Sequence, residues 1–277
     1  MKHFLYLLPF IFSVNISSAQ LGMPTVAGAA GAGAGDASVA YTNINSIIGN
    51  QAGLAFMDGW GATAFYQSRY SLPELASVGG AFAIPLKKAG VFGLSVHSFG
   101  KSDRYADQKI GLAYARKLAP GFSIGGQIDY IGLTIPQYGN RGLVTFELGI
   151  IGQVMPKLKV GVHAYSPIRQ KINETEYVPA VLSAGAAYEP NKKCLITAEY
   201  EQDMRNLPVF KAGIDYRIAP VLSLRLGVGS AANLNGAGST VLVSGGFGVH
   251  LTKIAIDITA QYHNQLGYTP CIGVRWQ

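Results

Sequence analysis

The stretch 222–228 reads LSLRLGV, and the stretch 254–262 reads IAIDITAQY. In both stretches every second residue is apolar, and most of the residues between them are polar or small. This period of two predicts β-strands with one apolar and one polar face. The same alternation recurs from residue 61 to the end of the chain, with hardly any helical pattern. Such a succession is typical of a membrane β-barrel, whose apolar face meets lipid and whose polar face lines the lumen.

The composition agrees with a barrel. Charged residues make up 13% of the chain, against about 25% in soluble globular proteins. After the N-terminal segment there is no apolar run of the roughly 18 residues that a membrane-spanning helix needs. A closed barrel is the other structure that satisfies every backbone polar group in lipid. The net charge is +7, but the basic residues are dispersed rather than clustered, so nucleic acid is not an expected partner.

The N-terminus has the pattern of a signal peptide. Lys2 and His3 form a short basic region, Phe4–Val14 is apolar, and Ser17–Ala19 supplies small residues before Gln20. This order predicts a targeting segment over 1–19 that is removed from the mature protein. Together with a barrel, it predicts location in the outer membrane of a Gram-negative bacterium.

Two further segments follow. Residues 20–60 are rich in glycine and alanine, and we expect them to lie inside the lumen as a plug, because small residues allow close backbone packing. Residues 61–277 are expected to form a transmembrane antiparallel barrel of about 14 strands, the even number typical of such proteins. The expected strands are 62–71, 75–85, 89–101, 107–117, 121–135, 141–154, 158–168, 178–189, 193–204, 207–219, 221–231, 239–251, 253–264 and 267–276.

The connections alternate in length. Short turns, expected at the periplasmic end, alternate with a set that includes the longer segments 101–107, 135–141, 168–178 and 231–239, expected at the extracellular end. Counting across these hairpins predicts which inward residues face one another. The predicted pairs are Lys109 with Asp129, Asp215 with Arg225, Asp257 with Arg275, and Lys211 with Glu199 or Glu201.

One inward row carries more charge than the rest. It consists of His97, Lys109, Asp129, Glu147 and His163, from five successive expected strands. Asp129 and Glu147 should lie side by side, with Lys109 beyond Asp129. The row has two interpretations. It is either a proton-sensitive or ligand-contacting site, or a salt-bridged network that fills the interior, since buried charges need partners.

No enzymatic site emerges from the sequence. The histidines of the mature chain fall on separate expected strands without metal-ligand spacing, and there is no nucleophile-elbow motif. We therefore expect a protein that is not an enzyme and that uses neither a cofactor nor a metal.

The segment before the first expected strand resembles a known family. Residues 33–40 read GAGDASVA and residues 50–55 read NQAGLA. This is similar to the N-terminus of the FadL superfamily of outer-membrane barrels, which carries G-x-G-x-A-x-V-A followed by N-P-A-G-L-A; here Gln51 replaces the proline. The resemblance implies a fourteen-stranded barrel with an N-terminal lumenal plug. The plug residues that carry it are Gly33, Gly35, Asp36, Asn50, Gln51, Ala52 and Gly53.

The resemblance also implies two functions. The superfamily includes channels for hydrophobic compounds and, in Bacteroidota, the PorV and PorQ type barrels of the type IX secretion system. The cleavage context, the short loops and the small size look more like the Bacteroidota group. The first expectation is therefore a non-enzymatic accessory or scaffold subunit of protein secretion or surface assembly, with secretion components or secreted proteins as partners. The alternative is a FadL-like channel that takes up hydrophobic small molecules. Outer-membrane lipid surrounds the barrel in either case.

Overall fold

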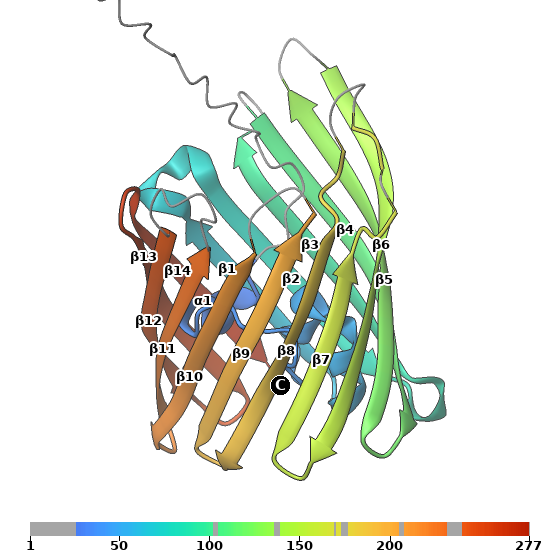
Figure 1. Cartoon of the computed structure of the whole chain (residues 1–277), viewed down its shortest axis with the longest axis vertical. Coiled ribbons are helices and arrows are strands. Elements are labelled where there is room, and N and C mark those ends of the chain that lie inside the picture. Colours follow the sequence, from blue (N-terminus) through green and yellow to red (C-terminus); the bar gives the residue numbers. More distant parts are fainter. Residues whose placement is uncertain are drawn as a thin grey trace, which may run out of the picture.

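A computed structural model describes residues 26–101, 105–135, 139–168, 170–172, 177–204, 208–231 and 240–276. Within these residues, fourteen antiparallel strands close into one barrel, in which each strand pairs with its neighbours along the chain and the last pairs with the first (Figure 1). The predicted fold class is confirmed. The predicted signal peptide lies outside the described residues and stays a prediction.

The strands are β1 Gly61–Ser68, β2 Ala76–Pro85, β3 Val91–Lys101, β4 Tyr105–Ala119, β5 Phe122–Ile135, β6 Gly139–Met155, β7 Leu158–Tyr165, β8 Val181–Asn191, β9 Cys194–Asp203, β10 Val209–Ala219, β11 Leu222–Ala231, β12 Thr240–His250, β13 Ile254–His263 and β14 Gly267–Trp276. The helices are α1 Gly28–Gly33 and α2 Ser46–Gly49, with the 3-10 helices η1 Gln51–Phe56, η2 Arg69–Ser71, η3 Pro73–Leu75 and η4 Lys87–Ala89. Every expected strand has a counterpart. β1 and β7 each end three residues earlier than expected; at the end of β1 the chain leaves the sheet at Ser68 and turns through η2, where Tyr70 has a φ of 55°.

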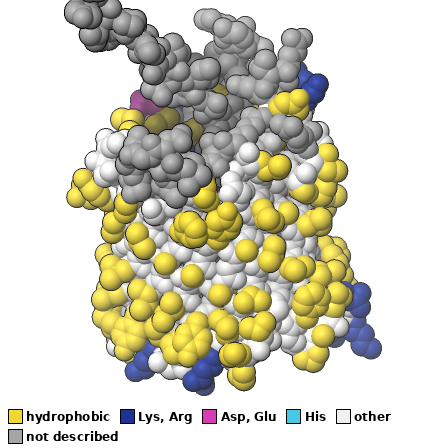
Figure 2. Space-filling view, in the orientation of Figure 1, with side chains coloured by type: hydrophobic (Ala, Val, Ile, Leu, Met, Phe, Trp, Pro, Cys, Tyr) yellow, Lys and Arg dark blue, Asp and Glu magenta, His cyan; other side chains and the backbone are white. Residues whose placement is uncertain are grey.

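The two faces of the wall differ as the alternation predicts. In β11, Leu224 is 46% exposed on the outside, whereas Ser223 beside it is 1% exposed on the inside. Hydrophobic side chains spread over the outer surface, and Lys and Arg gather at the end where the short turns lie (Figure 2). This pattern places the apolar face toward lipid. Within the described part of the chain, no helix is long and apolar enough to cross a membrane.

The segment Val26–Met57 lies inside the ring of strands, with α1 at about mid-height (Figure 1). Its apolar side chains, including Ile44, Ile47 and Leu54, are buried against the inner face of the first strands of the barrel. That inner face is made of small residues such as Ala83, Ala113 and Ala115, which leave room for the segment. We call Val26–Met57 the plug segment.

Candidate functional site

The plug segment approaches the wall at glycines. A Cβ atom at Gly227 of β11 would collide with the backbone nitrogen of Gly35, and one at Gly213 of β10 would collide with the carbonyl oxygen of Ala34. Gly35 itself has a φ of +70° and lies against the backbone of β10 and β11. Only glycine allows backbone to approach backbone this closely. Gly125 and Gly161 are further inward glycines in such contact with the plug segment, and Gly149 lies as closely against the Asn50 side chain.

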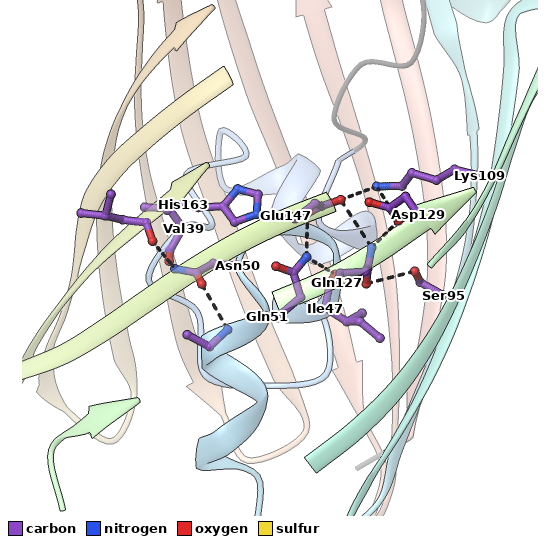
Figure 3. A network of polar contacts seen from close by, with 12 residues as sticks. Val39, Ile47, Asn50, Gln51, Ser95, Lys109, Gln127, Asp129, Glu147 and His163 are labelled. Atoms are coloured by element: carbon purple, nitrogen blue, oxygen red, sulfur yellow. Dashed lines mark hydrogen bonds and ion pairs between the residues drawn. The ribbon is translucent and has the colours of Figure 1, made fainter. Parts of the chain in front are cut away.

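A buried carboxylate links the charged row to the plug segment. One carboxylate oxygen of Glu147 in β6 accepts a hydrogen bond from Lys109 Nζ at 2.9 Å. Its other oxygen lies 2.6 Å from Gln51 Nε2 and 3.0 Å from His163 Nε2 (Figure 3). Glu147 is 1% exposed, so these contacts replace the solvation that it loses. We call Lys109, Asp129, Glu147, His163 and Gln51 the first network.

The register of the row differs from the predicted one. Asp129 lies opposite Gly111 and Thr145, rather than opposite Lys109 and Glu147. The turn between β4 and β5 is centred near Pro120 rather than at residue 119, so the pairing is displaced by two residues from the predicted register. Lys109 therefore reaches past Asp129, at 4.0 Å, to the closer Glu147.

His97 is the row residue that the first network leaves out. It lies opposite Lys109, and its ring stacks on Phe65 with 6.3 Å between the ring centroids. Among the described residues, no hydrogen bond or ion pair joins His97 to the rest of the row. Gln51, by contrast, is the residue that stands where the family motif has proline. Its amide is the group that ties the plug segment to Glu147, a role that proline lacks the donor to perform.

Asn50 anchors the same turn of the plug segment. Its side-chain nitrogen lies 2.7 Å from the carbonyl oxygen of Val39 and 3.2 Å from that of Ile150 in β6. Its side-chain oxygen accepts a hydrogen bond from the Ala52 amide at 3.2 Å. In the same motif, Gly53 packs so closely on Tyr41 that a Cβ atom would collide with the Tyr41 carbonyl oxygen.

The predicted pairs near the short turns join into a second network of four residues. Asp215 lies opposite Arg225, as predicted, with 2.6 Å between Oδ2 and Nε. Arg225 Nη1 also lies 2.7 Å from Asp257 Oδ1. Asp257 lies opposite Gly273 rather than Arg275, but its Oδ2 still lies 2.9 Å from Arg275 Nε along the diagonal. Two guanidinium groups and two carboxylates therefore alternate across the lumen, and the sequence predicted the pairs without their connection.

A third cluster fastens the start of the plug segment. Lys211 lies opposite Glu199, with its Nζ 3.3 Å from that carboxylate and 2.8 Å from Glu201. One carboxylate oxygen of Glu199 accepts hydrogen bonds from two backbone amides, that of Ser38 at 2.7 Å and that of Val39 at 2.8 Å. Lys211 also lies 4.0 Å from Asp36.

Asp36 has an unusual environment for a carboxyl group. Its Oδ1 accepts a hydrogen bond from the Ala27 amide at 2.9 Å. Burial raises the pKa of Asp36 to about 7, although the nearby Lys211 ammonium acts to lower it. Gly33, another residue of the plug motif, packs its backbone against the Thr259 side chain of β13.

Little space separates the first network from the Lys211 cluster. The cavity lined by Asp36, Glu147 and Lys211 has a volume of about 20 Å³, which is room for about one water molecule. Among the described residues at this level, the plug segment and paired charges leave only this small cavity between the two groups.

An apolar patch on the inner wall was missed by the sequence analysis. It lies toward the longer connections and consists of buried side chains on β5, β7, β8 and the segment between β7 and β8. We call it the apolar cluster: Ile131, Leu133, Tyr165, Ile172, Val178 and Val181. Ile131 and Leu133 share the inward parity of Asp129, so aliphatic residues at inward positions were the available signal. Lys109 Nζ lies 5.2 Å from the centre of the Tyr165 ring, so the apolar cluster borders the first network.

The barrel has the fold of several solved outer-membrane proteins. The Ralstonia pickettii toluene transporter TbuX matches with a TM-score of 0.72 and 12% identity over 90% of this chain and 98% of that chain. A Pseudomonas aeruginosa FadL homologue matches with a TM-score of 0.69 and 13% identity over 90% and 98%. The monoaromatic hydrocarbon channel CymD matches with a TM-score of 0.69 and 14% identity over 90% and 97%. Neither a family model nor a curated protein sequence matches the chain.

These comparisons show that the chain has the fold of FadL-like barrels. The matched proteins are channels and transporters rather than enzymes. Among the described residues, no group of three or more His, Cys, Asp or Glu side chains could hold a metal ion. The first network and the Lys211 cluster thus attach the plug segment to the wall, the second network joins wall strands to one another, and the apolar cluster is a buried patch on the inner wall.

Proposed function

We propose that this barrel is a passive outer-membrane channel for small hydrophobic molecules. The apolar cluster is the observation that carries the proposal. Its side chains face inward, away from lipid, and form an apolar patch separate from the alanine-rich inner face that contacts the plug segment. An apolar molecule that contacts such a patch gains about 25 cal/mol for each Å² of apolar surface removed from water.

The kind of ligand follows from the chemistry of the cluster. Its members are aliphatic side chains and one tyrosine, so it suits molecules without strong hydrogen-bonding groups. The structural neighbours agree with this chemistry, since TbuX is a toluene transporter and CymD is a monoaromatic hydrocarbon channel. Toluene is therefore a suitable probe for this chain.

A scaffold role in secretion is the second candidate. The observation that favours it is the firm attachment of the plug segment, because a filled lumen makes a rigid body. The neighbours described above do not support this role, since each of them is a channel, a transporter or a FadL homologue. The alternative that the sequence offered, a hydrophobic channel, thus has more support than the first expectation.

Uptake by whole cells separates the two candidates. A Gram-negative host without its own FadL-type channel would express the wild-type barrel, Leu133→Asn or the volume-conserving Leu133→Met. We expect the wild type and Leu133→Met to raise the initial rate of radiolabelled toluene uptake above the empty-vector rate. Leu133→Asn should lose most of this gain, because it places an amide in the apolar cluster.

Heat-modifiable gel mobility would show that each variant is folded in the outer membrane. A folded wild-type barrel that gives no uptake above the vector would contradict the channel and favour a scaffold. Equal uptake by folded Leu133→Asn and the wild type would show that the apolar cluster is not on the route.

A further inference from the structure

A basic cleft opens at the end of the barrel that carries the short turns. It has a volume of about 230 Å³ and lies between plug residues 40–43 and the inner wall, where Arg217, His250 and Arg275 line it. A second cleft of about 560 Å³ shares these three residues and extends to Lys253 in the turn between β12 and β13. The two clefts thus have these three residues in common, and both lie at the end that faces the periplasm in the usual topology of such barrels.

Arg217 differs from the inward cations of the three charged clusters described above. Lys109, Lys211, Arg225 and Arg275 each have a carboxylate oxygen within 3.3 Å. Among the described residues, no carboxylate lies within ion-pair distance of the Arg217 side chain. Arg217 lies opposite Ser223, next to the second network on the inner face.

The acidic groups of the cleft do not cancel this charge. Asp215 is engaged by Arg225 at 2.6 Å, and Glu189 is engaged by Lys159 at 2.9 Å. The second network is neutral as a whole, with two guanidinium groups against two carboxylates. Arg217 therefore contributes an uncompensated charge, and Lys192 and Lys193 at the rim add to it.

The donors in the cleft suit an oxyanion. The planar guanidinium of Arg217 presents its N–H groups as a fork that matches a phosphate or a carboxylate. Arg275 uses Nε toward Asp257. His250 is held by a contact of 2.8 Å between its Nε2 and the Ser223 hydroxyl. These three side chains come from β10, β12 and β14, so a group in the cleft would be met from several sides.

We infer that this cleft is a binding site for the phosphate or carboxylate group of a small anion, with Arg217 as its principal contact. Its volume suits a small solute or a lipid headgroup rather than a whole lipid, since drug-sized ligands occupy about 300–1,000 Å³. The site lies on the periplasmic side of the plug segment, away from the apolar cluster. It is therefore independent of what the barrel carries.

Calorimetric titration of the purified full chain would test the site. The barrel, in a nonionic detergent and at constant ionic strength, is titrated with glycerol 3-phosphate and with acetate. We expect saturable binding of at least one of them, and Arg217→Gln should weaken it roughly 10- to 100-fold, the effect of losing a charge-assisted hydrogen bond. Arg116→Gln is the matched control, because Arg116 also lies near the short turns but on the outer face of β4.

A second arm identifies the source of the anion. Barrels in nanodiscs of phosphatidylcholine, with or without one fifth phosphatidylglycerol, are compared by native mass spectrometry for retained lipid. Phosphatidylglycerol retained by the wild type and lost in Arg217→Gln would support the site with a lipid headgroup as its ligand, whereas binding of the soluble anions alone would support a free solute. Absence of saturable binding in both arms, or equal weakening by Arg116→Gln and Arg217→Gln, would overturn the inference.

Discussion

Gly227 and Gly229 lie two residues apart on the inner face of β11, yet only Gly227 meets the backbone of the plug segment. A Cβ atom at Gly229 would meet only Leu242 Cβ, at 3.9 Å. Gly227→Ala should therefore lower the free energy of unfolding by about 1–3 kcal/mol through overpacking, whereas Gly229→Ala should change it little. Urea unfolding from liposomes measures both, and equal effects would show that the plug segment does not touch β11 at this point.

Asp36 should make the free energy of unfolding depend on pH in a direction that its pKa fixes. Its pKa is about 7 in the folded protein against an ordinary value of 3.8. Between these values the folded chain holds the proton more tightly than the unfolded chain, so the contribution to stability falls as the pH rises from about 4 to about 7. Above that range the contribution is constant.

Asp36→Asn should remove this part of the pH dependence. The substitution keeps the oxygen that accepts the Ala27 amide, and asparagine tolerates the φ of 57° at this position. The free energy of unfolding, measured for both proteins at several pH values, should fall more steeply with rising pH in the wild type. Parallel curves would mean that Asp36 ionises as an ordinary carboxyl group.

At the scale of the strands, alternation alone predicted the count, the order and the inward faces. It did so because lipid outside and polar groups inside impose a period of two on every strand. The register between neighbouring strands was harder to predict. The observed register of the Asp215 hairpin agrees with the predicted one, but the registers of the Asp129 and Asp257 hairpins differ from it by two residues. The exact positions of the turn between β4 and β5 and of the turn after His263 set those registers, and neither position can be read from the alternation.

The interior was predictable only in part. Charged residues at inward positions were visible in the sequence, and long side chains such as Lys109 still met carboxylates despite the shifted register. The contacts between the plug segment and the wall were not visible, because they depend on where Asn50 and Gln51 meet β6. The apolar cluster was overlooked because its members come from several strands.

The outer face of β11 offers a test of membrane depth. Leu226 lies in the middle of the strand and is 64% exposed, whereas Val221 lies in the adjoining short turn and is 57% exposed. Leu226→Arg should cost about 2–4 kcal/mol, as expected at the bilayer midplane, and Val221→Arg about 0–1 kcal/mol near the interface. Unfolding from liposomes measures both costs, and a larger cost at Val221 would reverse the assigned depth.

For the whole molecule, the plug segment should control conductance. The cavity of about 20 Å³ between the first network and the Lys211 cluster admits no continuous column of water. Deleting residues 26–49 removes most of the plug segment and leaves Asn50 and Gln51 in place. Single-channel recordings in planar bilayers should then show larger steps than the wild type or Gly229→Ala. Unchanged conductance of the deletion variant would mean that these residues do not obstruct the lumen.

The claim that the lumen receives small hydrophobic molecules at the apolar cluster is tested most directly by photolabelling. The purified barrel is irradiated with a small aromatic diazirine, with and without excess toluene, and the labelled residues are mapped by mass spectrometry. We predict labels on β5 around Ile131 and Leu133 and on β7 at Tyr165 that toluene suppresses. Labels confined to the lipid-facing side chains, or inward labels that toluene leaves unchanged, would contradict the account.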